Sequence, residues 1–190
     1  MDLLNTSLAL ALPILRKGGL ILYPTDTIWG LGCDATNSDA IKRIYALKNR
    51  EEKKSLIILV EDLDMLQQYV SAPSPILLSY IFAATKPTTA IFKNAIHLPE
   101  ALVNEDGSIA VRIPKDNFCI KLINQFKKPL VSTSANISGE PSPQNFMEVS
   151  DKIKNGVDYI VQHRQDDLSK STPSSIIRLN EKNEIDFIRR

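Results

Sequence analysis

The sequence predicts an α/β domain built on a mixed β-sheet. Short apolar runs rich in β-branched residues recur along the 190-residue chain, and segments with apolar side chains at helical spacing separate many of them. Strands that alternate with helices favour a sheet with helices packed against it. The strand segments near the end of the chain are adjacent to one another, which indicates antiparallel pairs within the same sheet.

The first predicted helix covers residues 3–17, and the first predicted strand covers residues 20–23. Apolar side chains recur at helical spacing in the helix, and Gly18 is placed to end it. Pro13 should kink or restrict this helix, because proline lacks a backbone donor and crowds the preceding turn. The strand is a continuous apolar run ended by Pro24, which is typical of a strand buried on both faces.

Residues 23–35, YPTDTIWGLGCDA, are predicted as a turn that follows this strand. The turn concentrates polar side chains at 25–27, the single tryptophan of the chain (Trp29), and the glycines Gly30 and Gly32. A plain connection between a strand and a helix needs only a turn residue and a helix cap. The excess makes this segment a candidate for a functional site.

A helix is predicted over residues 38–50, with Ser38 as its N-cap, and the next strand over residues 55–60. The remainder of the chain continues the mixture of strands and helices. The further predicted strands cover residues 88–92, 109–113, 129–133, 158–162, 174–179 and 185–189. The further predicted helices cover residues 62–70, 75–84, 116–126 and 146–154.

Composition is that of an ordinary soluble globular domain, with 43% apolar and 24% charged residues, so a single domain over residues 1–190 is expected. The net charge is only +1, which argues against a dedicated nucleic-acid binder. The apolar segment 8–15 is too short to span a bilayer, and Asp2 before it is unlike the start of a secretory signal. A cytoplasmic protein without membrane association is expected.

Four polar clusters follow the ends of predicted strands or helices, at residues 24–27, 48–54, 132–143 and 170–175. Functional sites concentrate on such connections, although each cluster alone could serve only as a turn, a cap or a solvated face. Together, hydroxyl-rich loops and cations suit a phosphate-bearing substrate. Arg112 lies in an apolar strand, where a buried guanidinium is costly unless it faces an anion; the alternative is a side chain that faces solvent.

The easily recognised phosphate and metal motifs are absent from the sequence, including GxxxxGK[ST], GxGxxG, HExxH and the EF-hand loop. Cys33 and Cys119 lie far apart without a CxxC pair, so buried reduced thiols are expected rather than a disulfide or a zinc site. His97 and His163 are isolated as well. No metal site made of protein side chains is therefore predicted.

Five separated motifs resemble the YrdC domain family in order and spacing: GGLILYPTDTIWGLGCDA, LKNR, SIAVRIP, PLVSTSANISGEPS and PSSII. The resemblance runs from about residue 8 to the end of the chain, and the length is similar to that of a stand-alone synthase. It implies a twisted mixed sheet with flanking helices around a large basic cavity. The implied activity is that of a nucleotidyltransferase, which makes threonylcarbamoyl-AMP and pyrophosphate from L-threonine, bicarbonate and ATP.

The resemblance also implies site residues, by position within the matching motifs. Those implied to bind threonine are Thr27, Arg112, Ser132 and Ser174. Those implied to bind the nucleotide are Lys48, Arg50, Lys54, Ser108, Ser134, Asn136, Ser142 and Arg189. No residue is implied to act as a nucleophile; Arg50 and Lys54 would stabilise charge, and Mg²⁺ would accompany ATP.

The implied product would pass to the machinery that makes threonylcarbamoyladenosine in tRNA, and a direct contact with tRNA is left open. Two features depart from the family: TKPTT at 85–89 replaces a loop resembling Trp-Pro-Gly-Pro, and Leu59 stands where some members have a histidine that touches threonine. One alternative function is a double-stranded RNA or tRNA-binding module without catalysis. A second alternative is synthesis of carbamoyl adenylate from carbamoyl phosphate.

Overall fold

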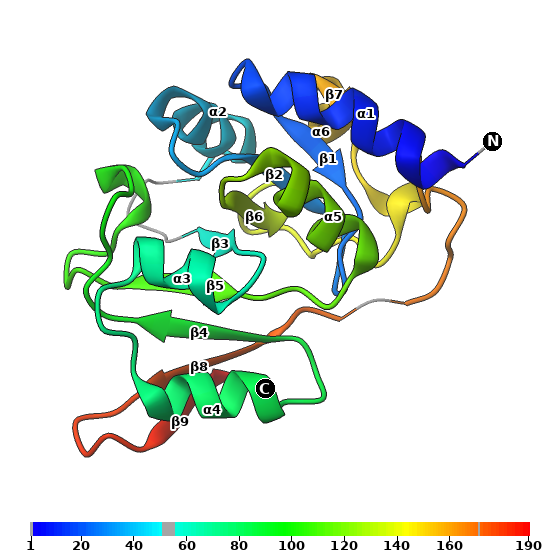
Figure 1. The fold of residues 1–190 in the computed structure, drawn as a ribbon. Helices are drawn as coiled ribbons and strands as arrows, with labels where there is room; N and C mark the ends of the chain where they lie inside the picture. Colours follow the sequence, from blue (N-terminus) through cyan, green and yellow to red (C-terminus); the bar gives the residue numbers. More distant parts are fainter. Residues whose placement is uncertain (1, 51–55, 171) are drawn as a thin grey trace.

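A computed structural model describes residues 2–50, 56–170 and 172–190, and one mixed sheet forms its centre (Figure 1). Within these residues the strands follow the spatial order β7-β1-β2-β6-β3-β5-β4-β8-β9. Neighbouring strands are parallel in the pairs β1–β7, β3–β5 and β4–β8 and antiparallel in the others. The strands are β1 (Ile21–Tyr23), β2 (Gly30–Asp34), β3 (Ile57–Leu59), β4 (Thr88–Phe92), β5 (Ile109–Arg112), β6 (Leu130–Ser134), β7 (Tyr159–Ile160), β8 (Ser175–Leu179) and β9 (Ile185–Arg189). The predicted mixed sheet is confirmed, including the antiparallel pair β8–β9.

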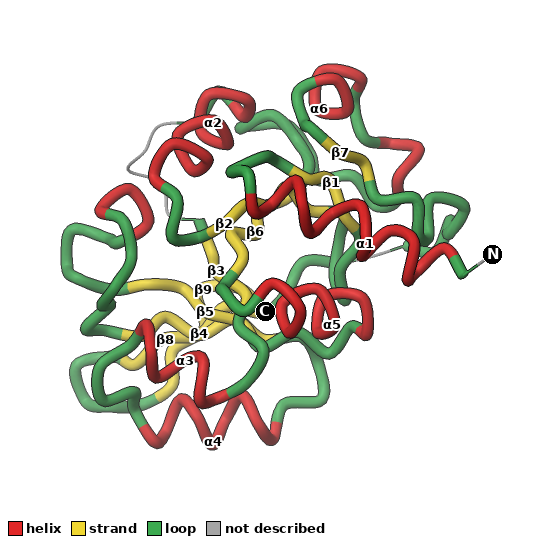
Figure 2. Tube along the Cα trace, turned by 45° about the horizontal axis from the view of Figure 1, so that its top comes forward, coloured by secondary structure: helices red, strands yellow, loops and turns green. Residues whose placement is uncertain are grey.

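Helices cover the sheet, and Figures 1 and 2 show α1, α3, α4 and α5 together on one of its faces. Helix α1 also packs against α5. The α-helices are α1 (Leu3–Arg16), α2 (Ser38–Lys48), α3 (Leu63–Tyr69), α4 (Pro75–Ala83), α5 (Asn117–Phe126) and α6 (Asp151–Asn155). Short 3-10 helices occur at η1 (Glu100–Leu102) and η2 (Phe146–Glu148), so the helix predicted over 146–154 is two separate pieces.

Strand β2 corrects the prediction of a turn over residues 23–35. Residues Gly30–Asp34 form a fully buried strand that pairs with β1 on one side and with β6 on the other. Gly32 is required there, because a Cβ atom would lie 2.6 Å from Cε1 of Tyr23 and 2.9 Å from the carbonyl oxygen of Val131. Only the segment before Gly30 is a turn, and it leads from β1 into β2.

Of two predicted helix ends, Gly18 ends α1 as expected, whereas the N-cap of α2 differs by one residue. Helix α1 continues through Pro13, and it ends where Gly18 adopts a φ of +75° and Gly19 N–H donates to the carbonyl of Ile14. Pro13 therefore does not stop the helix. At α2 the N-cap is Asn37 rather than Ser38, because Oδ1 of Asn37 accepts hydrogen bonds from the backbone N–H groups of Asp39 and Ala40.

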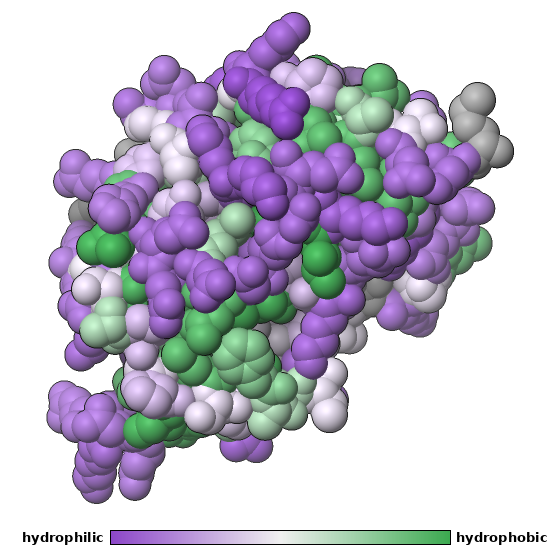
Figure 3. Space-filling view, in the orientation of Figure 1, coloured by the Kyte–Doolittle hydropathy of each residue, from purple (hydrophilic) through white to green (hydrophobic). Residues whose placement is uncertain are grey.

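The hydrophobic core has two parts. The larger part joins the sheet to α1, α2, α3 and α5, and the smaller part contains Leu22, Trp29, Leu31, Ala135, Val149 and Ile153. The ring of Trp29 lies 4.9 Å from that of Phe146, centroid to centroid, so this tryptophan packs in the smaller core. Figure 3 shows an apolar patch between α3 and α4, and α4 exposes Ile76 and Phe82.

Candidate functional site

One cavity gathers side chains from segments that lie far apart in the sequence. It holds about 190 Å³, and the described residues that line it include no carboxylate, so its charged side chains are all arginines. Its basic lining agrees with the cavity that the resemblance implies, whereas the volume enclosed by the described residues is modest. The lining residues are Thr25, Thr27, Ile28, Gly30, Arg50, Leu56, Ile57, Arg112, Ser132, Thr133, Ser134, Ser142, Pro173, Ser174, Ile176 and Arg189.

The turn between β1 and β2 forms one wall through a chain of hydroxyl groups. Oγ1 of Thr25 donates to the carbonyl of Ile28 at 2.8 Å, and it lies 2.9 Å from Oγ1 of Thr27. Because the hydroxyl proton of Thr25 is used on Ile28, Thr27 donates to Thr25. Oγ1 of Thr27 then accepts a hydrogen bond from Nη1 of Arg112 at 3.2 Å.

Arg112 ends strand β5, and its side chain is buried in this wall rather than exposed to solvent. Nη2 lies 3.4 Å from Oδ1 of Asp26, and Nε has no hydrogen-bond partner in the structure. A buried arginine with an unused N–H donor is costly unless an anion enters the cavity. Arg112 is therefore buried rather than solvated, and the anion that it faces in the structure is the carboxylate of Asp26.

The opposite wall comes from β6 and the loop that follows it. Ser132, Thr133 and Ser134 reach the cavity from β6, and Ser142 reaches it from the loop. The register of the sheet opposes Ser134 to Gly30, and Ser132 Oγ would lie 3.4 Å from a Cβ atom at Gly30. These serines offer hydroxyl donors to an anionic ligand.

Lys48 is not among the described residues that line the cavity, and its side chain has protein partners instead. Its side chain is buried, and Nζ donates to the carbonyl oxygens of Ser134 at 2.5 Å and of Asn136 at 2.6 Å. The backbone carbonyl of Lys48 accepts the N–H of Ser138. Burial, followed by the charge of Arg50, lowers the pKa of Lys48 to about 8. Lys48 therefore fastens the loop after β6 to helix α2.

Asn136 and Ser108 also lie outside the cavity lining. The amide nitrogen of Asn136 donates to the carbonyls of Ile137 and Glu140, so this side chain shapes the loop. Ser108 donates its hydroxyl to Asp106 in the turn before β5 and lines a different cavity. Lys54 falls outside the described residues.

Arg50 reaches the cavity from the end of α2. Asn49 ends the helix in the left-handed conformation, with φ at 49°, and turns the chain so that Arg50 lines the cavity. Burial lowers the pKa of Arg50, although a guanidinium remains protonated at neutral pH.

Strands β8 and β9 close the site from the far edge of the sheet. Nε of Arg189 donates to the carbonyl of Ser174 at 2.8 Å, and the hydroxyl of Ser174 lies 2.8 Å from that of Thr89. Burial and the nearby charge of Arg112 lower the pKa of Arg189. The segment TKPTT, which differs from the family pattern, thus supports the site indirectly, because the hydroxyl of its Thr89 contacts that of Ser174.

Several contributors are not among the residues predicted for the site. Thr25 has a signal in the sequence, because it belongs to the PTDT cluster, whereas Ile28 and Ile176 have none. Arg164 is a supporting residue: Nη1 donates to the carbonyl of Thr25 at 3.3 Å and to Oδ2 of Asp116 at 2.9 Å. Leu59 is fully buried beside Arg112 in the sheet and does not line the cavity.

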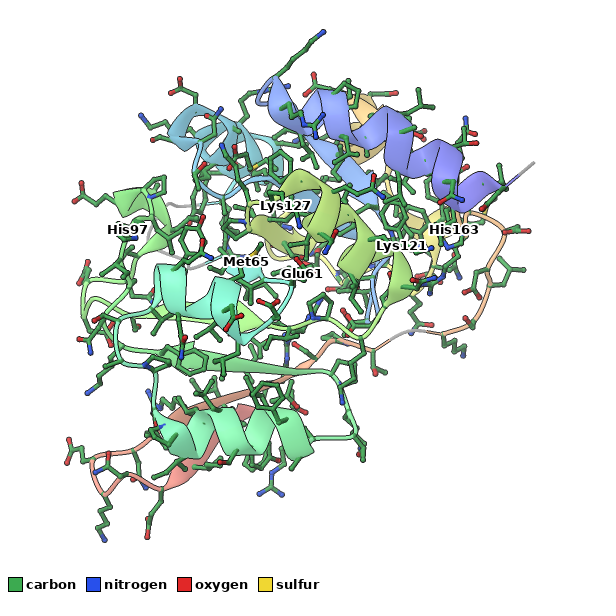
Figure 4. All side chains as sticks on the ribbon, viewed as in Figure 1. Glu61, Met65, His97, Lys121, Lys127 and His163 are labelled. Carbon is green, nitrogen blue, oxygen red and sulfur yellow. The ribbon has the colours of Figure 1, made fainter. Side chains whose placement is uncertain are left out.

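The cysteines and histidines have structural surroundings. Cys33 and Cys119 are buried free thiols, as expected, and burial raises the pKa of both above the usual range. Figure 4 shows His97 and His163 on opposite sides of the molecule. Within the described ranges no group of three or more His, Cys, Asp or Glu side chains is arranged to hold a metal ion. No helix there combines the length and apolar character needed to cross a membrane.

Comparison of the sequence with known families and proteins gives consistent matches. A profile of the Sua5/YciO/YrdC family, described as telomere recombination, matches residues 13–190. The chain is 33% identical over 160 residues to a threonylcarbamoyl-AMP synthase of Pseudoalteromonas translucida, covering 83% of this chain and 86% of the relative. It is 34% identical over 161 residues to the threonylcarbamoyl-AMP synthase of Halorhodospira halophila, covering 84% of each.

Solved structures share the fold. Sua5 of P. abyssi, in a crystal structure with L-threonine, superposes with a TM-score of 0.84 at 26% identity, over 96% of this chain and 53% of that one. YciO of E. coli superposes with a TM-score of 0.82 at 24% identity, over 96% and 88% of the two chains. This chain therefore spans about half the length of the Sua5 chain and most of YciO.

Proposed function

The chain belongs to the Sua5/YciO/YrdC family, and on that basis we propose that it is a threonylcarbamoyl-AMP synthase. Its reaction would join L-threonine, bicarbonate and ATP and release pyrophosphate. The observation that carries the proposal is the convergence of Arg50, Arg112 and Arg189 on one cavity whose described lining has no carboxylate. Such a cavity is complementary to two anionic groups at once, a carboxylate and a chain of phosphates.

The two substrates would lie side by side in this cavity, each bound by its own group of side chains. Arg112, Thr27 and Ser132 would receive the carboxylate and hydroxyl groups of L-threonine, with Ser174 nearby. Arg50 and Arg189 would face the phosphates of ATP, because guanidinium groups match phosphate oxygens in charge and geometry. Ser134 and Ser142 would add hydroxyl donors. Lys54 remains a prediction for the same end.

The chemistry needs no protein nucleophile. The amine of threonine adds to carbon dioxide derived from bicarbonate, which gives a carbamate. A carbamate oxygen then forms a bond to the α-phosphorus of ATP, the bond from that phosphorus to the bridging oxygen breaks, and pyrophosphate leaves with the electron pair. Catalysis by such a site consists of positioning and of stabilising the charge on the phosphoryl oxygens.

Mg²⁺ would enter as part of the substrate, bound to the phosphates of ATP. The described lining offers hydroxyl groups but no carboxylate that could hold a resident Mg²⁺ ion. The product would pass to the enzymes that complete threonylcarbamoyladenosine in tRNA.

The first test is pyrophosphate release by the purified protein with ATP, Mg²⁺ and bicarbonate, with and without L-threonine. Release should depend on L-threonine, and L-serine serves as the control substrate. Release with carbamoyl phosphate in place of threonine and bicarbonate would point to carbamoyl adenylate synthesis instead. RNA binding that falls steeply with salt and ignores threonine, without pyrophosphate release, would point to a binding module.

Two substitutions separate the ends of the cavity. Arg50→Ala should lower kcat/KM by about 100-fold or more, because a charge that stabilises the phosphates is lost. Arg112→Ala should instead raise the KM for L-threonine by about 10- to 100-fold, since a charged hydrogen bond to the carboxylate is lost. Arg178→Ala is the matched control: this arginine pairs with Asp186 and does not line the cavity. Wild-type kinetics in both folded variants would contradict the site assignment.

A further inference from the structure

Asp26 is a buried carboxylate that lies against the guanidinium of Arg112. The two side chains are only 9% and 4% exposed, and Oδ1 of Asp26 lies 3.4 Å from Nη2 of Arg112. Oδ1 makes no hydrogen bond in the structure, so its partner is the charge of the arginine. Asp26 is not among the cavity-lining residues, so it would act on a substrate through a neighbour, and Arg112 is the lining residue with which it forms an ion pair.

The carboxylate is held in place from the protein side. Oδ2 of Asp26 accepts the backbone N–H of Lys115 at 3.0 Å, and Lys115 follows β5 closely in the chain. Asp26 therefore links the turn after β1 to the end of the strand that carries Arg112. A carboxylate fixed by a backbone donor loses little additional freedom when it orients a neighbouring side chain.

The three nitrogens of Arg112 have different surroundings. Nη1 donates to Oγ1 of Thr27, Nη2 faces Asp26, and Nε has no partner in the structure. Arg189 carries a charge of the same sign in the same cavity, and burial together with the charge of Arg112 lowers the pKa of Arg189. Without Asp26, the guanidinium groups of Arg50, Arg112 and Arg189 would share the cavity with no carboxylate among its described lining, which is unfavourable away from water.

We propose that Asp26 is a positioning residue for the recognition of L-threonine. Its carboxylate balances the charge of Arg112 and, together with Thr27, holds the guanidinium in one orientation in the wall of the cavity, where it would receive the substrate carboxylate. The inference rests on the proposed function, since it assigns Asp26 to the threonine end of the same site.

The test compares Asp26→Asn, which removes the charge at nearly constant size, with Asp26→Glu, which keeps it. Asp26→Asn should raise the KM for L-threonine by about 10-fold, while kcat and the KM for ATP change by less than about 3-fold. Asp26→Glu should restore most of the affinity for threonine. Asp158→Asn is a matched control, because it breaks the exposed ion pair with Arg43 at residues that do not line the cavity.

A double variant shows whether Asp26 acts through Arg112. Asp26→Asn combined with Arg112→Ala should have the same KM for L-threonine as Arg112→Ala alone. Effects that add, or an Asp26→Asn variant with the wild-type KM for threonine, would overturn the inference. Thermal melting of each variant above the assay temperature ensures that folded proteins are compared.

Failure of the proposed function can be told apart from failure of this inference. If the wild-type protein releases no pyrophosphate but binds L-threonine in a calorimeter, the synthase reaction is wrong and the same variants are compared by their Kd for L-threonine. A Kd about 10-fold weaker in Asp26→Asn supports the positioning role, and an unchanged Kd overturns it. A wild-type protein that neither reacts with nor binds L-threonine overturns both.

Discussion

Lys48 illustrates how a cationic residue beside a binding site can serve the backbone instead of the ligand. Its ammonium group bonds two carbonyl oxygens of the loop after β6, and its own carbonyl accepts a third bond from that loop. A lysine without access to water is costly in its charged form, because the carbonyl dipoles replace only part of its hydration. The depressed pKa of about 8 reflects this cost.

The charge of Lys48 should make stability depend on pH. Below pH 8 both the folded and the unfolded chain hold the proton, and the full cost of the buried charge is present. As pH rises from about 8 toward the ordinary value of 10.5, the unfolded chain binds more protons than the folded one, so the free energy of unfolding rises. The expected gain is on the order of 1–3 kcal/mol.

Urea denaturation at pH 7.5 and pH 10 measures this gain against Lys48→Met, which cannot titrate there. The wild-type protein should become more stable relative to the variant at the higher pH. Replacement of the exposed Lys42 on the same helix by Met is the control. The stability of this variant relative to the wild type should be the same at pH 7.5 and pH 10. An identical pH dependence in wild type and Lys48→Met would contradict the prediction.

At the same scale, the sequence identified which residues belong together but not which atoms face the ligand. The motifs placed Thr27, Arg50, Arg112, Ser132, Ser134, Ser142, Ser174 and Arg189 in one site, and the structure brings these residues to one cavity. Lys48 and Asn136 share the same motifs but point into the loop. The direction of a side chain depends on tertiary contacts that a motif does not encode, such as the carbonyls of a loop about 90 residues away.

Among the elements, strand β2 is one that the strand propensities of its residues do not predict. Glycines weaken strands in general, so a segment with Gly30 and Gly32 resembles a turn in the sequence. In the structure the strand is central and buried, and its glycines make room for Tyr23 and for the serines of β6. The strands β4 and β9, which β-branched residues predict, and the helix α5, which apolar spacing predicts, agree with the structure almost to the residue.

Gly32→Ala should destabilise the protein by about 1–3 kcal/mol, because the new Cβ atom would overlap the ring of Tyr23 and the carbonyl of Val131. Gly30→Ala is the matched control on the same strand. Its Cβ atom would come no closer than 3.4 Å to its neighbours, so a much smaller loss is expected. Urea denaturation of the two variants measures the difference, and equal losses would show that packing at Gly32 is not the cause.

For the whole molecule, the order of strands could not be derived from the sequence. Strand β6 lies between β2 and β3, and β1 lies beside β7, although these partners are far apart in the chain. Alternating strands and helices indicate a sheet with flanking helices, yet many strand orders satisfy that pattern. The cavity depends on this order, because residues from early in the chain, such as Thr25, and from late in the chain, such as Arg189, line it together.

Binding of substrates should therefore stabilise parts of the molecule unequally. Strands β8 and β9 are joined to the rest of the sheet through β4, and they contribute Ser174 from the preceding residue and Arg189 from the edge strand. ATP with L-threonine should slow amide hydrogen exchange in residues 175–189 more than in α1, which does not line the cavity. Exchange followed by mass spectrometry measures this, and equal change in both regions would contradict it.

The position of β6 between β2 and β3 also governs how the chain can fold. Residues 1–129 include β2, β3 and β5 but lack β6, so a partly synthesised chain leaves one edge of β2 and one edge of β3 unpaired. Pairing strands this distant in sequence is slow compared with forming local hairpins, and exposed strand edges invite aggregation in the meantime. The same arrangement that brings distant parts of the chain to one cavity thus delays completion of the central sheet until β6 has been synthesised.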